Sequence, residues 1–352
     1  MGRLRVGLMG LGSGGSQLVG SSLCEGLASS ARCYLVSVGA ARPHRLERFS
    51  ATYPGVSTYD DLRSMIVECP LDALFIALPP HLRSQYLPLA AERAIPVWAL
   101  TPPGRSLAEA VETFSAFETA KCPLVVSRWA PATAAQAHLQ VTSEKPFRPH
   151  FAQGRAMACV PESLDWRGDR SRAGGGALLH LGYPLVDAIV MCMGVPANGY
   201  AVAAVISRPT AASYDTEDTA SVVCQFGNGA IASIDACWTT AKPCCELTLS
   251  GEEKTYSFSS DGVTVTDNAC QTTAEVVPVL RNVFATEVET FLAAVAGESE
   301  HRPAAQRGHL RALAVIEAAY LSVRTGEAES PASLLELHRL AEIEPIEEEP
   351  AV

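Results

Sequence analysis

A glycine-rich segment near the N-terminus has the spacing of a phosphate-binding turn. The run Gly10–Gly15 reads G-x-G-x-x-G, follows the apolar segment Leu4–Met9 and precedes a predicted helix, which is the context that gives this pattern meaning. Gly10 permits the tight turn, Gly12 lets a pyrophosphate approach the backbone, and Gly15 lets helix and strand pack closely. The helix N-terminus adds N–H donors and a positive dipole end. The residues expected to contact a dinucleotide here are Gly10, Leu11, Gly12, Ser13 and Gly15.

The second predicted strand, Cys33–Val38, ends without the acidic residue that NAD-selective proteins usually place there for the ribose hydroxyls. Ala40 and Ala41 stand in that position, and Arg42 and Arg45 follow. An arginine can pair with the 2′-phosphate of NADP, so the sequence favours NADP slightly over NAD. Solvated charges at the start of a helix are the equal alternative. The further cofactor contacts expected at strand ends are Ala40, Arg42, Leu78, Pro79, His81 and Pro102.

A second group of reactive side chains lies on the predicted helix Ala177–Met193. His180, Tyr183, Pro184 and Asp187 are spaced i, i+3, i+4 and i+7, so they share one helical face. His180 can exchange a proton near neutral pH, Tyr183 can donate one to a carbonyl or imine, and Asp187 can orient either. The alternative, which we favour for Tyr183 and Asp187, is a core aromatic and a structural hydrogen-bond partner. Pro184 lacks a backbone N–H and should kink or break the helix.

Substrate contacts are expected after the last strand of the first domain and before the glycine run at 174–176. The expected residues are Arg128, Trp129, Trp166 and Arg167. A structural or solvent-facing role is the alternative for each of them. No group of His, Cys, Asp or Glu in the sequence has convincing metal-ligand spacing, and no G-x-S-x-G sequence suggests a hydrolase.

The composition is that of a folded, acidic chain. It has 352 residues, of which 48% are hydrophobic, and a formal net charge of -11. This charge argues against sequence-independent binding to nucleic acid, and no apolar run is expected to span a bilayer. The 11 cysteines include no C-x-x-C pair, which favours free thiols in a reducing compartment. We therefore expect a cytoplasmic protein that acts on small molecules, without nucleic-acid or membrane partners.

The predicted elements divide the chain into two domains. Up to Val126, wholly apolar strands alternate with helices, as in a parallel sheet covered on both faces. After Arg128 the pattern is β-rich, and Gly227–Gly229 between two alternating runs predicts a hairpin. We expect an α/β Rossmann domain with a parallel sheet at 1–126, an α+β domain with an open, mostly antiparallel sheet at 127–345, and an acidic tail at 346–352. The closing helix near 308–324 is expected to pack back on the first domain.

Several segments, in their order and spacing, resemble one oxidoreductase family. They are Gly10–Gly15, Asp72–Leu82, Pro102–Ala110, Ala173–Gly194 and Gly308–Glu327. The chain resembles the Gfo/Idh/MocA family, named for glucose-fructose oxidoreductase and inositol dehydrogenase. The resemblance implies the two domains expected above and NAD(P)-linked redox chemistry, often on sugars or cyclitols. It also implies homo-oligomers, dimers or tetramers, built through the open sheet.

The sequence departs from this family at its working residues. The family reads E-K-P after the fifth strand, and here Thr101 replaces the lysine that binds and polarises the substrate; Pro102 is kept, and a cis bond before it would be in keeping with the family. Where the family reads D-x-G-x-H-x-x-D, this sequence has His180 in place of the first aspartate and Pro184 in place of the histidine. Asp187 matches the last aspartate of the motif. The ordinary Lys/His proton relay is therefore absent. The catalytic candidates that remain are His180, Tyr183, Asp187 and Thr101.

Three functions are compatible with this pattern. The first is an NAD(P)-dependent oxidoreductase that reduces a carbonyl or imine with a different proton relay, since reduction needs only a proton donor. The second is a catalytically inactive homologue that binds a dinucleotide or metabolite in a regulatory or partner role. The third is non-redox net chemistry, such as elimination through transient oxidation, with His180 as the only evident base. We favour the first because the glycine turn is intact.

Overall fold

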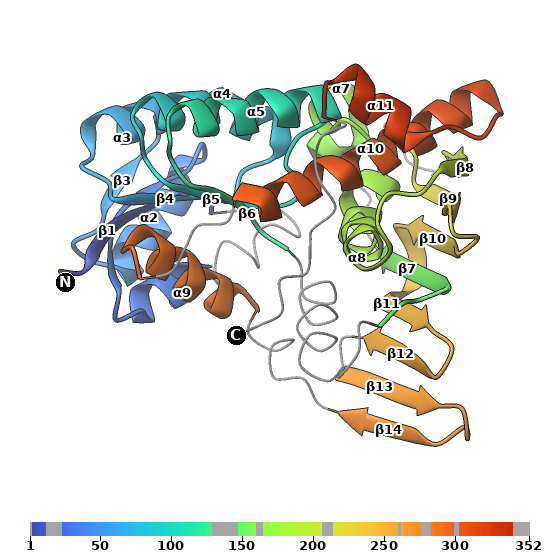
Figure 1. Ribbon diagram of the computed structural model, residues 1–352. Helices are drawn as coiled ribbons and strands as arrows, with labels where there is room; N and C mark the ends of the chain where they lie inside the picture. The colour runs from blue at the N-terminus through green and yellow to red at the C-terminus, as the bar shows by residue number, and fades with distance from the viewer. Residues whose placement is uncertain are drawn as a thin grey trace. The chain divides into compact units, whose positions relative to one another are not determined.

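The chain crosses repeatedly between two structural units. The computed structural model describes residues 2–11, 23–128, 147–159, 165–205, 214–259, 262–275, 283–298 and 303–340 (Figure 1). Unit 1 comprises Met1–Gly104, Glu109–Ser127 and Asn282–Gln306, and unit 2 comprises Arg105–Ala108, Arg128–Arg281 and Arg307–Val352. The first domain was expected to end at residue 126. The second segment of unit 1 ends at Ser127. The expected packing of the closing helix on the first domain stays a prediction; residues from 307 are grouped with unit 2, and the late segment grouped with unit 1 is 282–306.

Unit 1 is built on a six-stranded sheet in which every pair is parallel, in the order β3-β2-β1-β4-β5-β6. Its strands are β1 (Leu4–Met9), β2 (Cys33–Gly39), β3 (Ser57–Tyr59), β4 (Ala73–Ile76), β5 (Val97–Ala99) and β6 (Leu124–Val126). Its helices are α2 (Pro43–Thr52), α3 (Leu62–Glu68), α4 (Pro80–Glu92), α5 (Leu107–Thr119), whose first two residues belong to unit 2, and α9 (Val283–Val295). This is the strand order of a Rossmann fold, so the expected α/β class of the N-terminal domain is confirmed.

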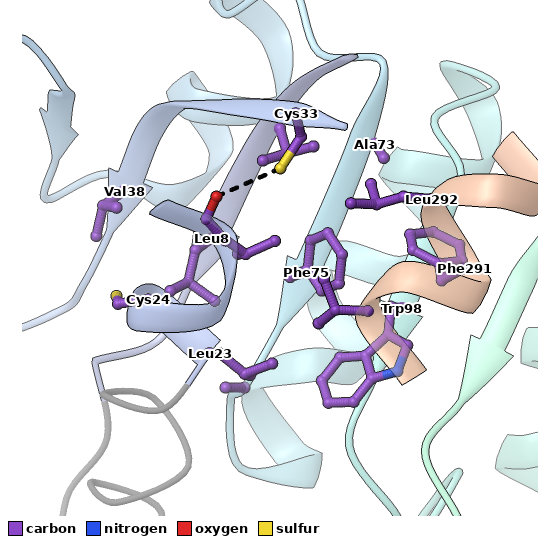
Figure 2. Close-up of a cluster of buried hydrophobic side chains, with 14 of the residues drawn as sticks. Leu8, Leu23, Cys24, Cys33, Val38, Ala73, Phe75, Trp98, Phe291 and Leu292 are labelled. Atoms are coloured by element: carbon purple, nitrogen blue, oxygen red, sulfur yellow. Dashed lines mark hydrogen bonds between the residues drawn. The ribbon is translucent and has the colours of Figure 1, made fainter. Parts of the chain in front are cut away.

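The core of unit 1 joins residues from distant parts of the chain. Phe75 of β4 meets the ring of Phe291 from α9 edge-on, with 5.3 Å between ring centroids, and lies 5.8 Å from Trp98 of β5 (Figure 2). Strand β4 has no exposed residue because both faces of a parallel sheet are covered. Hydrogen bonds reinforce the junction, since the Ser127 hydroxyl donates to Glu287 of α9 over 2.7 Å. Helix α9 therefore completes the core of unit 1.

Unit 2 is built on an eight-stranded, mostly antiparallel sheet in the order β14-β13-β12-β11-β7-β10-β9-β8. Only β7 and β10 are parallel among its paired strands. The strands are β7 (Phe151–Cys159), β8 (Asn198–Ala204), β9 (Thr219–Gln225), β10 (Ile231–Cys237), β11 (Thr239–Ser250), β12 (Lys254–Ser259), β13 (Gly262–Asp267) and β14 (Thr272–Glu275). The expected open, mostly antiparallel sheet is confirmed. The hairpin predicted at Gly227–Gly229 joins β9 to β10, and Gly229 has the positive φ that such turns need.

Strand β7 lies at the centre of this sheet, yet its sequence predicts no strand. Its buried positions are Ala152, Gly154 and Ala156, which are too small to give an apolar alternation. A Cβ at Gly154 would lie 3.1 Å from the Cβ of Leu185. The small residues are required because α8 (Tyr183–Met193) packs directly on the strand.

The helix predicted over Ala177–Met193 changes its winding before Pro184. It follows a 3-10 turn (Asp165–Gly168) and α7 (Arg170–Ala173), and it begins as a π-helical turn, Leu178–Gly182, which α8 continues. In a π turn each backbone carbonyl accepts from the N–H group five residues later instead of four. A carbonyl in this turn therefore does not need an N–H group from a proline four residues after it. The helices α10 (Pro303–Thr325), of which 303–306 belong to unit 1, and α11 (Pro331–Leu337) complete the described part of unit 2.

The helical run Arg170–Met193 is the only described helix whose length and mean hydropathy would suffice to cross a membrane. The expectation that no apolar run is long enough was therefore too strict. Of its most apolar window, 72% is buried inside the protein, as in the core helix of a soluble protein. All eleven cysteines are free thiols. The acidic tail at 346–352 lies outside the described residues.

Candidate active site

The carboxyl ends of the unit 1 strands lie in register. Met9 is opposite both Gly39 and Ile76, and Ile76 is opposite Ala99. The residues that follow these strands therefore lie along one edge of the sheet. The strand order reverses between β1 and β4, and this switch point is where open parallel sheets bind ligands. The predicted cofactor residues along this edge are Gly10, Leu11, Ala40, Arg42, Leu78, Pro79, His81 and Pro102.

Gly10 is the first residue after β1, and its geometry requires glycine. Its φ is +99°, and a Cβ there would lie 2.5 Å from the carbonyl oxygen of Ala77. Its N–H donates to Gly39, which ties the turn to β2. The turn therefore starts at a residue that accepts no side chain. The predicted contacts Gly12, Ser13 and Gly15 lie outside the described residues.

Three arginines, Arg42, Arg45 and Arg48, follow β2, and none of them pairs with an acidic side chain of the described residues. Ala40 is buried and Arg42 is exposed, and the guanidinium of Arg42 has no partner among the described residues. Arg45 donates to the carbonyl of Leu11 over 3.2 Å, so it also contacts the turn after β1. Burial lowers the pKa of Arg45, and the positive charges of Arg42 and Arg48 lower it further. A local excess of positive charge thus lies at the end of β2.

The loop after β5 is held by a buried arginine. Arg83 of α4 is 2% exposed, and its guanidinium donates to the carbonyls of Leu100 and Pro102. Between these residues lies Thr101, whose peptide bond to Pro102 is cis, as the family resemblance implies. The Thr101 hydroxyl is buried and has no hydrogen-bond partner among the described residues. A buried hydroxyl without a partner is unusual, and it marks this loop as a place where a ligand can bind.

In unit 2, three of the predicted residues form one cluster. The His180 ring meets the Trp166 ring edge-on at 5.2 Å, and the Arg167 guanidinium lies over the same indole, 4.5 Å from its centroid. His180 Nε2 is 3.1 Å from the carbonyl oxygen of Ala173. A carbonyl only accepts, so Nε2 carries the proton in this contact and Nδ1 is the exchangeable nitrogen. Burial lowers the pKa of Arg167.

One short segment holds both this cluster and the helix that carries His180. The Thr216 hydroxyl donates to the Arg167 carbonyl over 2.8 Å. The buried Glu217 carboxylate accepts from the backbone N–H groups of Gly176 and Leu178, at 2.9 and 3.1 Å. A Cβ at Gly176 would overlap the backbone carbonyl of Glu217, so glycine is required there. Residues 216 and 217 are adjacent, so one short segment fixes both the backbone of Arg167 and the start of the helix that carries His180.

Tyr320 completes the environment of Glu217. Its hydroxyl donates to Glu217 Oε1 over 2.7 Å. Burial raises the pKa of Tyr320 well above its ordinary value, and the neighbouring Glu217 charge raises it further. The phenol therefore stays protonated and remains a donor to the carboxylate.

Tyr183 and Asp187 lie in a separate, buried network. The Tyr183 hydroxyl is 2.7 Å from His309 Nδ1, and its ring stacks on that imidazole. Arg128 donates to Asp187 Oδ2 over 2.8 Å, and Asp187 Oδ1 is 3.8 Å from His309 Nδ1. Tyr183, Asp187 and His309 are each no more than 1% exposed. These groups hold one another inside unit 2, although Asp187 Oδ1 accepts no hydrogen bond among the described residues.

The structure thus sorts the predicted residues into separate groups. His180, Trp166 and Arg167 are brought together, and Tyr183, Asp187 and Arg128 form another group; Trp129 lies outside the described residues. The sequence reasoning missed Glu217 and His309. The signal for Glu217 was present, because three polar residues, 216–218, directly precede the alternating strand β9. Among the described residues no group of His, Cys, Asp or Glu could hold a metal ion.

The Rossmann sheet of unit 1 and the mostly antiparallel sheet of unit 2 are an arrangement shared with solved two-domain oxidoreductases. Residues 140–257 match the family model described as the GFO/IDH/MocA C-terminal domain. Together with the fold, this match confirms the resemblance to the Gfo/Idh/MocA family that the sequence predicts. A sequence comparison with curated proteins gives no match.

Solved structures share the fold over nearly the whole chain. An oxidoreductase from Agrobacterium radiobacter in complex with NAD+, L-tartaric acid and magnesium has a TM-score of 0.79 and 17% identity, over 95% of this chain and 100% of its own. The WlbA dehydrogenase from Bordetella pertussis in complex with NADH and UDP-GlcNAcA has a TM-score of 0.75 and 21% identity, over 93% and 97%. Aldose-aldose oxidoreductase from Caulobacter crescentus complexed with glycerol has a TM-score of 0.79 and 19% identity, over 94% and 100%.

Proposed function

We propose that this protein is an NAD(P)-dependent oxidoreductase that reduces a carbonyl or imine of a small, sugar-like metabolite. The observation that carries the proposal is the edge of the unit 1 sheet, where Gly10 opens the turn at the switch point of a Rossmann order. Solved structures of this fold hold NAD+ or NADH, and others bear names of sugar enzymes. At these identities the likeness concerns the fold, so the activity rests on the residues of this chain.

The described residues fit a dinucleotide. The edge of the sheet offers the Gly10 turn, the unpartnered Thr101 hydroxyl and the cationic end of β2. The absence of an acidic residue at Ala40 and Ala41 removes the usual partner of the ribose hydroxyls, whereas Arg42 can bind a 2′-phosphate. We therefore propose a preference for NADP over NAD. When bound, the nicotinamide supplies the hydride that reduces the substrate carbon.

His180 supplies the proton in this proposal. The Ala173 carbonyl holds the Nε2 proton of His180, so the protonated ring carries its exchangeable proton on Nδ1. As the substrate carbon gains a hydride, its oxygen or nitrogen takes this proton and becomes a hydroxyl or amine. The imidazole becomes neutral and regains a proton from solvent. His180 is half-buried rather than fully enclosed.

The test has two parts. Mass spectrometry of the ligand released on denaturing the native protein identifies the cofactor, and NADP and NAD differ by the mass of one phosphate. Turnover of NADPH is then measured against ketones, imines and oxidised sugars for the wild type, His180→Ala and Tyr183→Phe. We expect His180→Ala to lose turnover and Tyr183→Phe to keep it. Full turnover in His180→Ala would refute the proton step.

A second candidate, a catalytically inactive dinucleotide-binding homologue, is favoured by one observation. Of the predicted catalytic residues on the Ala177–Met193 helix, Tyr183 and Asp187 are buried in hydrogen bonds and ion pairs with other protein groups. This leaves His180 as the single titratable group of that set that is not fully buried. The inactive homologue would bind NADPH without hydride exchange against any carbonyl or polyol. One efficient substrate would exclude it.

We also propose that copies of this chain associate through the outer face of the unit 2 sheet. Apolar side chains project from that face, with Tyr200 47% and Val223 51% exposed and directly opposite each other. Val202 and Ile231 are exposed on the neighbouring positions. Exposed apolar patches of this kind mark association surfaces. Light scattering after size-exclusion chromatography should find a smaller assembly for Val223→Asp, and no change for Val67→Asp in unit 1.

A further inference from the structure

We propose that Arg167 is an anion-recognition group, and that the substrate carries a carboxylate or phosphate a few bonds from the carbon that is reduced. The proposal rests on the proposed function, because it names the substrate class for the group that His180 protonates. It is carried by the placement of the Arg167 guanidinium, by its lack of an acidic partner and by the way its backbone is fixed.

The guanidinium and the imidazole share one platform. Arg167 lies 4.5 Å from the Trp166 centroid, and the His180 ring lies 5.2 Å from it. Because both distances are measured to the Trp166 ring, Cζ of Arg167 and the centre of the His180 ring are at most about 10 Å apart. A single small molecule can span this distance, with its oxyanion on Arg167 and its carbonyl on Nδ1 of His180. The N–H groups of the Arg167 guanidinium make no hydrogen bond or ion pair among the described residues, so they are the donors a ligand would meet.

Arg167 has no acidic partner at ion-pair distance in the described structure. Asp165 raises the pKa of Arg167 through its charge, but burial has the larger effect and lowers it. Asp165 itself is half-exposed and lies 4.0 Å from Arg172. Burying part of a guanidinium without a carboxylate or phosphate costs free energy, and an anionic ligand would recover it through charge-assisted hydrogen bonds.

The position of Arg167 is fixed by its backbone rather than by a side-chain ion pair. The Thr216 hydroxyl holds the Arg167 carbonyl, and the Asp215 N–H donates to the next carbonyl, that of Gly168, over 3.1 Å. Both donors belong to the segment that also holds the helix of His180 through Glu217. The guanidinium and the proton donor are therefore positioned together before a ligand arrives, which is what an efficient site requires.

The chemistry that fits is a keto acid, an oxidised uronic acid or a phosphorylated keto sugar. Arginine binds carboxylate and phosphate with the same forked geometry, so the structure defines the oxyanion and leaves its source to experiment. A neutral sugar would leave Arg167 unpaired in the complex.

The test uses the full chain saturated with NADPH, and malonate, inorganic phosphate and neutral malonamide as probes in isothermal titration. We expect malonate or phosphate to bind saturably and malonamide not to bind. Arg167→Met should weaken anion binding about 10- to 100-fold, the factor for a lost charge-assisted hydrogen bond, and Arg167→Lys should weaken it less. Arg155→Met, at an exposed arginine of the unit 2 sheet, is the matched control and should leave anion binding unchanged.

Each outcome of the titration has one interpretation. Response to malonate alone identifies a carboxylate and response to phosphate alone identifies a phosphate, and both support the proposal. Equal anion binding by wild type and Arg167→Met, or no saturable anion binding at all, would overturn it. Thermal unfolding and NADPH titration of every variant separate the failures, since a wild type that does not bind NADPH contradicts the proposed function, whereas normal NADPH binding without an Arg167 effect contradicts this inference alone.

Discussion

Replacing Glu217 with alanine should strongly destabilise unit 2. Glu217 Oε1 accepts three hydrogen bonds, from Gly176, Leu178 and Tyr320, at 2.9, 3.1 and 2.7 Å. The side chain is 4% exposed, so water cannot replace it when it is removed. Hydrogen bonds to a charged group contribute about 1.5–3 kcal/mol each. They share one acceptor and are not additive, so we expect a loss of about 3–5 kcal/mol in the free energy of unfolding.

Two variants separate the causes of this loss. Glu217→Gln keeps the shape and one acceptor oxygen, so its loss should be smaller, about 1–2 kcal/mol. Glu246→Ala removes a glutamate that is half-exposed and lies 3.6 Å from Arg155, and it should change stability by less than about 0.5 kcal/mol. The matched pair therefore compares a buried carboxylate with an exposed one on the same unit.

The assay is urea unfolding followed by circular dichroism, fitted without assuming a single transition because the chain has two units. Hydrogen exchange gives a local measure, since the amides of Gly176 and Leu178 should lose protection first in Glu217→Ala. A loss below about 1 kcal/mol, or unchanged protection at both amides, would refute the reasoning that this carboxylate holds the helix start.

Three further results are expected. Gly10→Ala should abolish NADPH binding measured by fluorescence titration and lower the melting temperature, because the alanine Cβ has no room; normal binding would contradict the crowding seen in the structure. Tyr183→Phe should lower the free energy of unfolding by about 1–2 kcal/mol, because His309 loses its hydroxyl partner, with any turnover unchanged. Arg5 lowers the pKa of Asp72, so this pair stabilises the fold above the unfolded pKa of Asp72 and loses that contribution as pH falls through the lower folded value. Urea midpoints of wild type and Asp72→Asn should therefore differ at neutral pH and converge in acid, and a constant difference would exclude this linkage.

The sequence predicts local structure well where periodicity and glycine chemistry act over short distances. The strand β1 has the bounds of the apolar segment Leu4–Met9 that precedes the glycine turn. The hairpin after β9 follows from two glycines around one asparagine. In each case a few neighbouring residues determine the backbone, so one sequence is enough.

Contacts between distant residues could not be predicted in this way. The Tyr183 hydroxyl and His309 are 126 positions apart, and Glu217 and Gly176 are 41 apart. No pattern within a window connects such pairs, and a polar residue in an apolar segment reads as a catalytic candidate until its partner is visible. This is why Tyr183 and Asp187 entered the predicted catalytic set while His309 did not. Strand β7 was missed for the opposite reason, since its inner residues are small to admit the packed helix.

The return of α9 to unit 1 has a consequence for how the protein is made. The Ser30 hydroxyl bonds to Glu289 across 259 positions of sequence, and Phe291 and Leu292 fill the apolar surface beside Phe75. A ribosome must therefore synthesise most of the chain before the first 127 residues can bury their core. Until then the nascent Rossmann strands carry an uncovered apolar surface, which is the kind of segment that chaperones bind and that aggregates when synthesis stops early.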